Sequence, residues 1–296
     1  MSAKYADIAA HRDEFPVSLM CRVLGVSPAG FYAAQRRPPS ARAQATAQLR
    51  VLVRATHAQS RKRYGAPRIH EALQQRQVRV SRKRIARVMQ EEALVGRMRR
   101  RFVVTTDSAH ADPIAPHKLR RDFAVGKQRA INRRWVSDVT YIPTRTGWLY
   151  LAIILDVTSR RIVGWATSAR NDATLVVTAL RRALALRQPK KGWMLHSDRG
   201  SVYASDAFRT CVRRHRGVAS MSRRANCWDN AVAESFFATL EWELLDDTVF
   251  ASHHAARRAL VEFIDRWYNH ERLHSTLGYQ SPAQFEQALS RTRRAA

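Results

Sequence analysis

Three apolar, strand-like segments follow one another closely in the second half of the chain, and they constrain its fold more than any other feature. Residues 135–142, 148–157 and 161–167 are rich in β-branched, aliphatic and aromatic side chains, the composition favoured in strands. The short connections between them predict an antiparallel meander. The middle segment is apolar almost throughout, as in strands that are buried on both faces. A sheet therefore lies at the centre of a layered domain.

After the meander, predicted helices and strands alternate. The predicted elements are a helix over 172–186, a buried strand over 193–197, a helix over 205–214, a short strand near Val218 and a long helix over 231–245. Together with the meander, this element order resembles a ribonuclease-H-like fold. We predict an α/β catalytic-size domain with three layers and a mixed sheet over residues 134–250, followed by a helical extension over 251–296.

The first part of the chain has all-α, helix-turn-helix character over residues 1–60. The apolar stripe is made of Leu19, Val23, Leu24 and Val26, Gly25 supplies a turn, and Ser27 with Pro28 forms a helix start. A second unit of similar design is predicted over residues 61–100.

The last helix of the second unit begins after Ser81 and carries a basic face made of Arg82, Lys83, Arg84 and Arg87. Such a face is typical of a helix that presents cations to a DNA groove or backbone. A solvated basic helix is the alternative interpretation. Residues 101–133 are predicted to be a basic linker, because their prolines do not allow long helices.

The net charge limits the classes of partner. The chain has 52 Lys and Arg against 24 Asp and Glu, a net charge of +28, and most of the excess lies before the meander. Such an excess indicates a polyanionic partner, because each neutralised phosphate releases condensed counterions. A ribosomal or nucleoid protein that coats nucleic acid would share this composition.

Cysteine usage and hydropathy indicate the compartment. The 3 cysteines of the 296-residue chain are widely spaced, which argues against a disulfide framework or a zinc site. The sequence has neither an apolar run of membrane-spanning length nor an apolar signal region at its start. We expect a cytoplasmic protein that is associated with the nucleoid and not with a membrane.

Three carboxylates occupy distinct places in the predicted domain. Asp138 lies in the middle of a strand, Asp198 at the end of another, and Glu234 in the first turn of a helix, with 35 residues between the last two. Phosphodiester transfer requires Mg²⁺ to activate the incoming oxygen and to stabilise the leaving one, which two ions together can do. Each acid alone also has a structural explanation, but their combined placement favours a metal site.

Longer stretches around these acids resemble a known family. WVSDVTYI surrounds Asp138, LHSDRGSVYAS surrounds Asp198, MSRRANCWDNAVAESFFATLE surrounds Glu234, and WYNHERLHSTLGYQSPAQF follows near the end. With SRKRIARVM and RKRYGAPRIHEAL in the front half, the chain resembles the second-frame (OrfB) protein of IS3-family bacterial insertion sequences. The catalytic core of that family is of the retroviral-integrase type.

The resemblance implies an activity, a cofactor and partners. It implies a transposase that cleaves double-stranded DNA at transposon ends and joins the free 3′-OH to target DNA by in-line displacement. Asp138, Asp198 and Glu234 would hold two Mg²⁺ ions, for which Mn²⁺ can substitute. Joining two ends implies a homo-oligomer on DNA, and the family also has a first-frame (OrfA) partner.

Further residues are candidates for support and DNA contact. His196 alternates with Asp198 and is a candidate to orient it or to support the core, and Asn230 is a candidate to support the site. Related integrases carry lysines one and two turns beyond the catalytic Glu, where this chain has Ala238 and Glu241. We therefore expect Arg223 and Arg224, in the loop before the Glu234 helix, to contact DNA.

Two functional alternatives and one misleading motif accompany this interpretation. A repressor, an architectural DNA-binding protein or a catalytically decayed transposase would bind DNA without joining it, and a ribonuclease-H-type nuclease would cut without joining. His270-Glu271-Arg272-Leu273-His274 matches the HExxH zinc-protease signature. The sequence context supplies no suitable third ligand, so we expect structural or DNA-contacting histidines.

Overall fold

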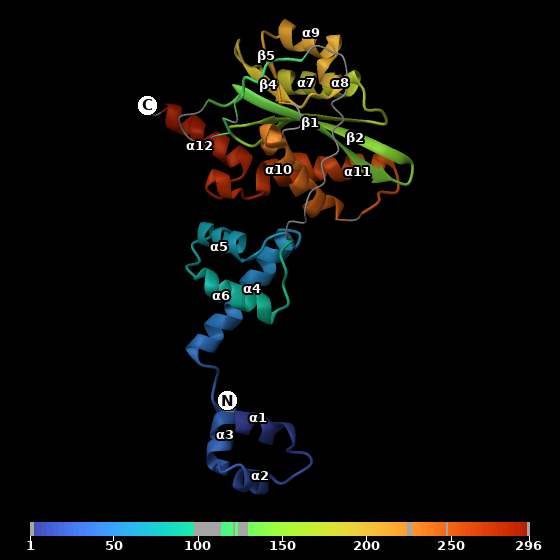
Figure 1. Cartoon of the computed structure of the whole chain (residues 1–296). Helices are drawn as coiled ribbons and strands as arrows, with labels where there is room; N and C mark the ends of the chain where they lie inside the picture. The colour runs from blue at the N-terminus through green and yellow to red at the C-terminus, as the bar shows by residue number, and fades with distance from the viewer. Residues whose placement is uncertain are drawn as a thin grey trace.

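The computed structural model describes residues 3–97, 114–120, 122–123, 130–223, 227–246 and 248–294. Figure 1 shows a small helical module at the N-terminus, a second helical module, and a large α/β domain that carries the C-terminus. Most of the predicted basic linker, including residues 101–113, lies outside the described residues, as do residues 98–100 of the second predicted unit.

The N-terminal module contains α1 (Ala3–Ala10), α2 (Val17–Val23) and α3 (Pro28–Arg36). The side chain of Ser27 caps α3 by accepting from the backbone N–H of Gly30 at 3.0 Å, as its sequence predicts. The expected apolar stripe contributes only in part to the core of the module. Leu24 and Val26 pack against the buried residues Ile8, Cys21 and Phe31, whereas Leu19 and Val23 are 46% and 76% exposed. The apolar pattern of so short a helix does not determine which of its sides packs against the other helices.

The second module contains α4 (Ala41–Gln59), α5 (Ala66–Gln75) and α6 (Arg82–Glu91). Its buried apolar residues come from all three helices, as Val53, Leu73 and Ile85 illustrate. Arg50 of α4 also pairs with Glu91 at 2.6 Å. The sequence placed α4 in the first region, with a boundary at residue 60, whereas in the structure α4 packs with α5 and α6.

The α/β domain is built on a five-stranded mixed sheet. The strands are β1 (Arg134–Thr144), β2 (Gly147–Asp156), β3 (Ile162–Ser168), β4 (Met194–Ser197) and β5 (Val218–Met221). They lie in the order β3-β2-β1-β4-β5. The meander β1-β2-β3 is antiparallel, as predicted, and β4 pairs in parallel with both β1 and β5.

Helices cover both faces of the sheet (Figure 1). One face carries α7 (Ala173–Arg187), α8 (Ser201–Ala204) and α9 (Asp206–Arg214). The other face carries α10 (Ala231–Leu240) and α11 (His253–Val261). The 3-10 turn η1 (Cys227–Asn230) directly precedes α10. The remaining elements are the π-helical continuations η2 (Glu241–Leu245) and η3 (Glu262–Glu271), the 3-10 turn η4 (Ser275–Leu277) and α12 (Pro282–Arg294).

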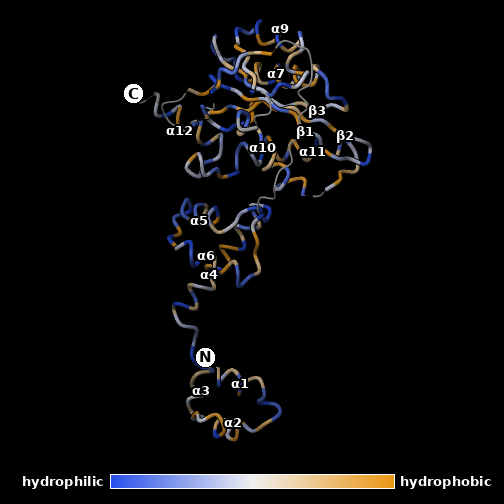
Figure 2. Tube along the Cα trace, in the orientation of Figure 1, coloured by the Kyte–Doolittle hydropathy of each residue, from blue (hydrophilic) through white to orange (hydrophobic). Residues whose placement is uncertain are grey.

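Burial on both faces explains the apolar run of β2. Leu151, Ile153 and Leu155 pack in the cluster that contains α10 and α11, whereas Ala152 and Ile154 pack in the cluster that contains α7. Successive side chains of a strand point to opposite faces, so the residues on each face of β2 pack against a layer of helices. The hydropathy colours of Figure 2 follow the same pattern, with apolar segments inside the α/β domain.

The C-terminal segment belongs to this packing. Ala256, Leu260 and Phe263, all beyond residue 250, are fully buried in the same cluster as β1 and β2. The predicted extension over 251–296 therefore supplies much of one helical layer of the domain.

The second helical module is anchored to this layer. The hydroxyl of Tyr64 accepts from the backbone N–H of Leu273 at 2.8 Å, and the Tyr64 ring lies 5.5 Å from that of Trp267. Arg61 forms an ion pair with Glu262. The module therefore has a defined position beside the α/β domain.

No single helix in the described ranges is long and apolar enough to cross a membrane. By length and composition alone, the bent pair α2 and α3 meets that criterion together.

Candidate active site

Three neighbouring elements bring the predicted carboxylates to one region. Asp138 lies in the middle of β1, Asp198 directly follows β4, and Glu234 stands in the first turn of α10. Val136 of β1 is paired in parallel with His196 of β4. Continuing that register by two residues places Asp138 beside Asp198, on the same side of the sheet.

The acids act on one another electrostatically. Burial and then the charge of Asp198 raise the pKa of Asp138 well above its usual range, and Glu234 adds to the effect. The Asp138 carboxylate accepts from the backbone N–H of Val139 at 2.9 Å and from the side-chain amide of Asn230 at 3.0 Å. These two donors oppose the rise in pKa. The negative charges of Asp198 and Glu234 acting on Asp138 favour a bound cation.

The turn after β4 fixes Asp198. Its Oδ1 atom accepts from the backbone N–H of Gly200 at 2.9 Å. A Cβ atom at position 200 would lie 3.1 Å from the same oxygen, so a larger residue would crowd the carboxylate. Glycine therefore allows the turn to hold Asp198 at the end of the strand.

The donor set suits a hard divalent cation. The three side chains offer only carboxylate oxygens, and the Oδ1 atom of Asn230 is a further oxygen that is buried without a hydrogen-bond partner in the described structure. Within the same residues, no three His, Cys, Asp or Glu side chains are close enough to form a ready-made site for one ion. Mg²⁺ commonly uses only one or two carboxylates and completes its shell with water and phosphate, so the residues fit this ion.

A buried tyrosine supports the acids from within the domain. Tyr203 of α8 is 1% exposed, and its hydroxyl lies 3.0 Å from that of Ser137, the residue before Asp138. Burial and the charges of Asp138 and Asp198 raise the pKa of Tyr203 well above its usual value. The neutral phenol is therefore maintained beside the carboxylates. No spacing in the sequence indicated this residue.

His196 links two strands of the sheet. It is fully buried, with Nδ1 2.9 Å from the hydroxyl of Ser220 and Nε2 3.2 Å from that of Ser222. Burial, assisted by His117, lowers the pKa of His196 to about 4. Both nitrogens of the neutral ring are thus engaged with β5 and the residue that follows it, which favours structural support over direct orientation of Asp198.

The loop before α10 is held by a buried carboxylate. Asp229 is fully buried and accepts from Nε and Nη2 of Arg223, each at 3.0 Å. His117 lies 3.6 Å from the same carboxylate. Arg223 therefore stabilises the loop that positions Asn230, although its side chain is still 52% exposed. Arg224, the other predicted DNA contact in this loop, lies outside the described residues.

The basic face of α6 is partly available to a ligand. Arg82, Lys83 and Arg87 are exposed, whereas Arg84 is half-buried. Arg84 donates to the hydroxyl of Thr46 on α4 at 2.9 Å. Three of the four predicted cations are thus accessible from solvent, and the fourth joins two helices of its module.

The HExxH pattern does not form a zinc site. His270 is exposed near the end of η3, whereas His274 follows the helix and is buried. The His274 ring packs 4.9 Å from that of Tyr268. The two imidazoles are therefore not one turn apart on a helix, which agrees with the structural role expected for His274.

Comparisons with known proteins match this architecture. Family models described as an integrase core domain match residues 128–227 and 216–282, and a model described as an HTH-like domain matches residues 44–102. The transposase InsF of insertion sequence IS3A from Escherichia coli is 36% identical over 285 residues, which cover 96% of this chain and 98% of InsF. The chain belongs to the IS3 family of insertion-sequence transposases.

A second relative supports the same assignment. The 31 kDa protein of insertion element IS600 from Shigella sonnei is 39% identical over 268 residues, covering 90% of this chain and 97% of that protein. Membership of the IS3 family confirms the resemblance read from the motifs and the integrase-type core with its mixed sheet. The HTH-like match also begins within α4, in agreement with the packing of α4 against α5 and α6.

Solved structures with similar chains include retroviral integrases. A chain of the simian T-cell lymphotropic virus intasome aligns with a TM-score of 0.44 and 16% identity, covering 75% of this chain and 74% of that one. The HTLV-2 integrase catalytic core in complex with magnesium aligns with a TM-score of 0.40 and 16% identity, covering 52% of this chain and 95% of the core.

Proposed function

We propose that this chain is a transposase that cleaves DNA at insertion-sequence ends and joins the freed 3′-OH to another phosphodiester, using Asp138, Asp198 and Glu234. The observation that carries the proposal is the placement of these three acids on β1, directly after β4 and at the start of α10, where Asp198 and Glu234 act on Asp138. Transfer of a pre-cleaved element end into a plasmid, in Mg²⁺ or Mn²⁺, tests it. A repressor or architectural protein would bind the DNA and form no joined product, and a nuclease would cut without joining.

The three carboxylates would hold two Mg²⁺ ions. Bound there, the ions would activate the attacking oxygen and stabilise the leaving one. Asn230 keeps the Asp138 carboxylate oriented through its amide N–H, and the Gly200 backbone does the same for Asp198. Asp138 lies within a strand, Glu234 within a helix, and Asp198 directly after a strand, so the regular elements limit the movement of all three acids.

We propose that the second helical module binds the element ends through α6. Arg82, Lys83 and Arg87 are exposed on that helix, and the HTH-like family match includes it. The joining of two ends requires more than one active site, so we propose that the chain acts as a homo-oligomer on DNA. A first-frame partner of the family would contribute further end recognition.

The exposed cations of α6 give a prediction for DNA affinity. Substituting Arg82→Gln together with Arg87→Gln should weaken binding to a duplex that carries the element end. If each arginine neutralises one phosphate, the slope of log K against log[salt] becomes less negative by about 1.8. The matched control is Arg213→Gln with Arg214→Gln, which removes the same charge from exposed positions of α9. Equal slopes in the two double variants would argue against α6 as a DNA-binding helix.

The Asn230 amide gives a prediction for pH dependence. Its N–H lowers the pKa of Asp138, and cation binding requires the deprotonated carboxylate. In Asn230→Ala the pKa of Asp138 rises further, so the acid limb of the strand-transfer pH profile should move to higher pH and more Mg²⁺ should be needed at a given pH. Asn171→Ala, at an exposed loop position, should leave the profile unchanged. A uniform loss of rate at every pH would contradict the assigned role.

A further inference from the structure

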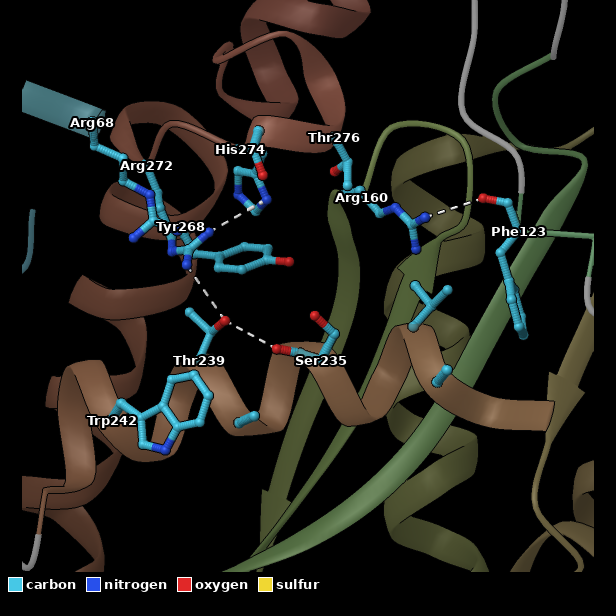
Figure 3. Close-up of a pocket in the computed structure, with 14 residues that line it drawn as sticks. Arg68, Phe123, Arg160, Ser235, Thr239, Trp242, Tyr268, Arg272, His274 and Thr276 are labelled. Carbon is cyan, nitrogen blue, oxygen red and sulfur yellow. Dashed lines mark hydrogen bonds between the residues drawn. The ribbon is translucent and has the colours of Figure 1, made fainter. Parts of the chain in front are cut away.

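A cavity of about 390 Å³ lies beside α10, between the second helical module and the α/β domain. Its lining includes Arg68 of α5, Arg160 of the turn between β2 and β3, and Arg272, His274 and Thr276 of the segment after η3. Figure 3 shows these side chains arranged around one space above the helix that carries Ser235 and Thr239. With α10, at least four separate parts of the chain therefore line the cavity.

Positive charge predominates around this cavity. Its lining holds three arginines and, among the described residues, neither an Asp nor a Glu. The nearby carboxylate of Glu243 lies behind the lining, where it accepts from Arg272 at 2.9 Å and is 3.7 Å from Arg68. The buried carboxylate of Asp156 also acts on Arg160, but two carboxylates do not balance the three arginines. The uncompensated charge favours an anion in the cavity.

Two polar atoms of the lining lack a partner. Nε2 of His274 and Nε of Arg160 are buried and make no hydrogen bond within the described structure. His274 is only 8% exposed. Burial and the nearby arginines, Arg272 first, lower the pKa of His274 well below its usual value, so the ring is neutral. Buried polar groups without partners are costly, and an oxygen-rich ligand would supply the missing partner.

The cavity lies along the helix that carries Glu234. Ala231, Ser235 and Ala238 line it and are small, so the surface of α10 leaves room for a ligand. Positive charge reaches this side of the helix from Arg68, Arg160 and Arg272.

We propose that this cavity binds a backbone phosphate of the DNA strand that passes from the second helical module to the three carboxylates. The inference rests on the proposed function, because it names a contact of that DNA. Arginines suit the site because guanidinium groups bind phosphate through paired hydrogen bonds. The location between the HTH-like module and Glu234 favours a polymer phosphate over a small free anion, since DNA held by α6 has to cross this gap.

The test compares the salt dependence of DNA binding in EDTA, where no strand transfer occurs. The probe is a duplex of mixed sequence. Arg68→Gln should make the slope of log K against log[salt] less negative by about 0.9, the loss of one phosphate contact. Arg68→Lys keeps the charge and should retain the wild-type slope. Because the Arg68 side chain is 28% exposed and only distantly paired with Glu243, both variants should fold.

A second pair of variants leaves every arginine in place. Thr276 is exposed on the cavity rim, so Thr276→Glu adds a negative charge to the site and Thr276→Gln is its neutral control. Thr276→Glu should weaken duplex binding and reduce the slope, whereas Thr276→Gln should match the wild type. Wild-type slopes for both Arg68→Gln and Thr276→Glu would overturn the proposal.

Further outcomes separate this proposal from its alternatives. Inorganic phosphate could bind the wild type but not Arg68→Gln, while both proteins show the same slope of log K against log[salt] for duplex binding. The cavity would then be a site for a free anion, and the proposal fails. If the slopes change as expected but the wild type joins no DNA in Mg²⁺, the phosphate site stands and the proposed transposase activity fails.

Discussion

Replacing Glu243 with Gln should lower the free energy of unfolding by about 3–5 kcal/mol, the cost of leaving buried cations without their counter-ion. Glu243 is 5% exposed. Its carboxylate accepts from Arg272 at 2.9 Å and from the indole N–H of Trp267 at 2.9 Å. Arg63 is also buried nearby, and burial lowers the pKa of Arg63 to about 10. The neutral amide keeps the shape of the side chain and loses its charge.

The control is two residues away. Glu241 is exposed, so Glu241→Gln should change the free energy of unfolding by no more than about 0.5 kcal/mol. The measurement is urea unfolding followed by tryptophan fluorescence. Replacing both Glu243 and Arg272 with Met should recover part of the loss, because an apolar pair needs no counter-ion. A loss below about 1 kcal/mol in Glu243→Gln would show that the arginines are neutralised in another way.

The local patterns of the sequence predicted the central elements correctly. The apolar run of β2 required burial on both faces, and the structure supplies a helical layer on each. The mid-strand position of Asp138 and the first-turn position of Glu234 also followed from local sequence. Strand alternation and helix starts depend on neighbouring residues, so they can be recognised without tertiary information.

Features that depend on distant contacts could not be predicted in this way. His117 and Asp229 are far apart in sequence, so their proximity depends on the tertiary fold. Arg223 could not be recognised as the partner of that buried carboxylate. The packing of α4 with α5 and α6, and of residues beyond 250 with the sheet, arises from side-chain contacts between elements. Such contacts set domain boundaries, and composition does not reveal them.

Replacing Glu234 with Gln should reduce strand transfer by at least about 10³-fold, because a cation bound by carboxylates supplies several kcal/mol of charge stabilisation in the transition state. Glutamine keeps the length of the side chain and its place in the first turn of α10. The change also removes a negative charge that raises the pKa of Asp138. Folding and duplex binding in EDTA should therefore be preserved.

Glu241→Gln is the matched control, since Glu241 is exposed on the continuation of the same helix and its charge is not among those that act on Asp138. Its strand-transfer rate should remain within a few-fold of the wild type. A similar loss of activity in both variants would indicate damage to α10 in general and not the loss of a metal ligand.

The most direct measurement is strand transfer of a pre-cleaved element end into plasmid DNA by the wild type and by Glu234→Gln, at equal DNA occupancy and in Mg²⁺ and Mn²⁺ separately. We predict joined product for the wild type with either cation, none in EDTA, and none above background for Glu234→Gln. Joined product at a comparable rate from Glu234→Gln would contradict the assignment of Asp138, Asp198 and Glu234 as the catalytic centre.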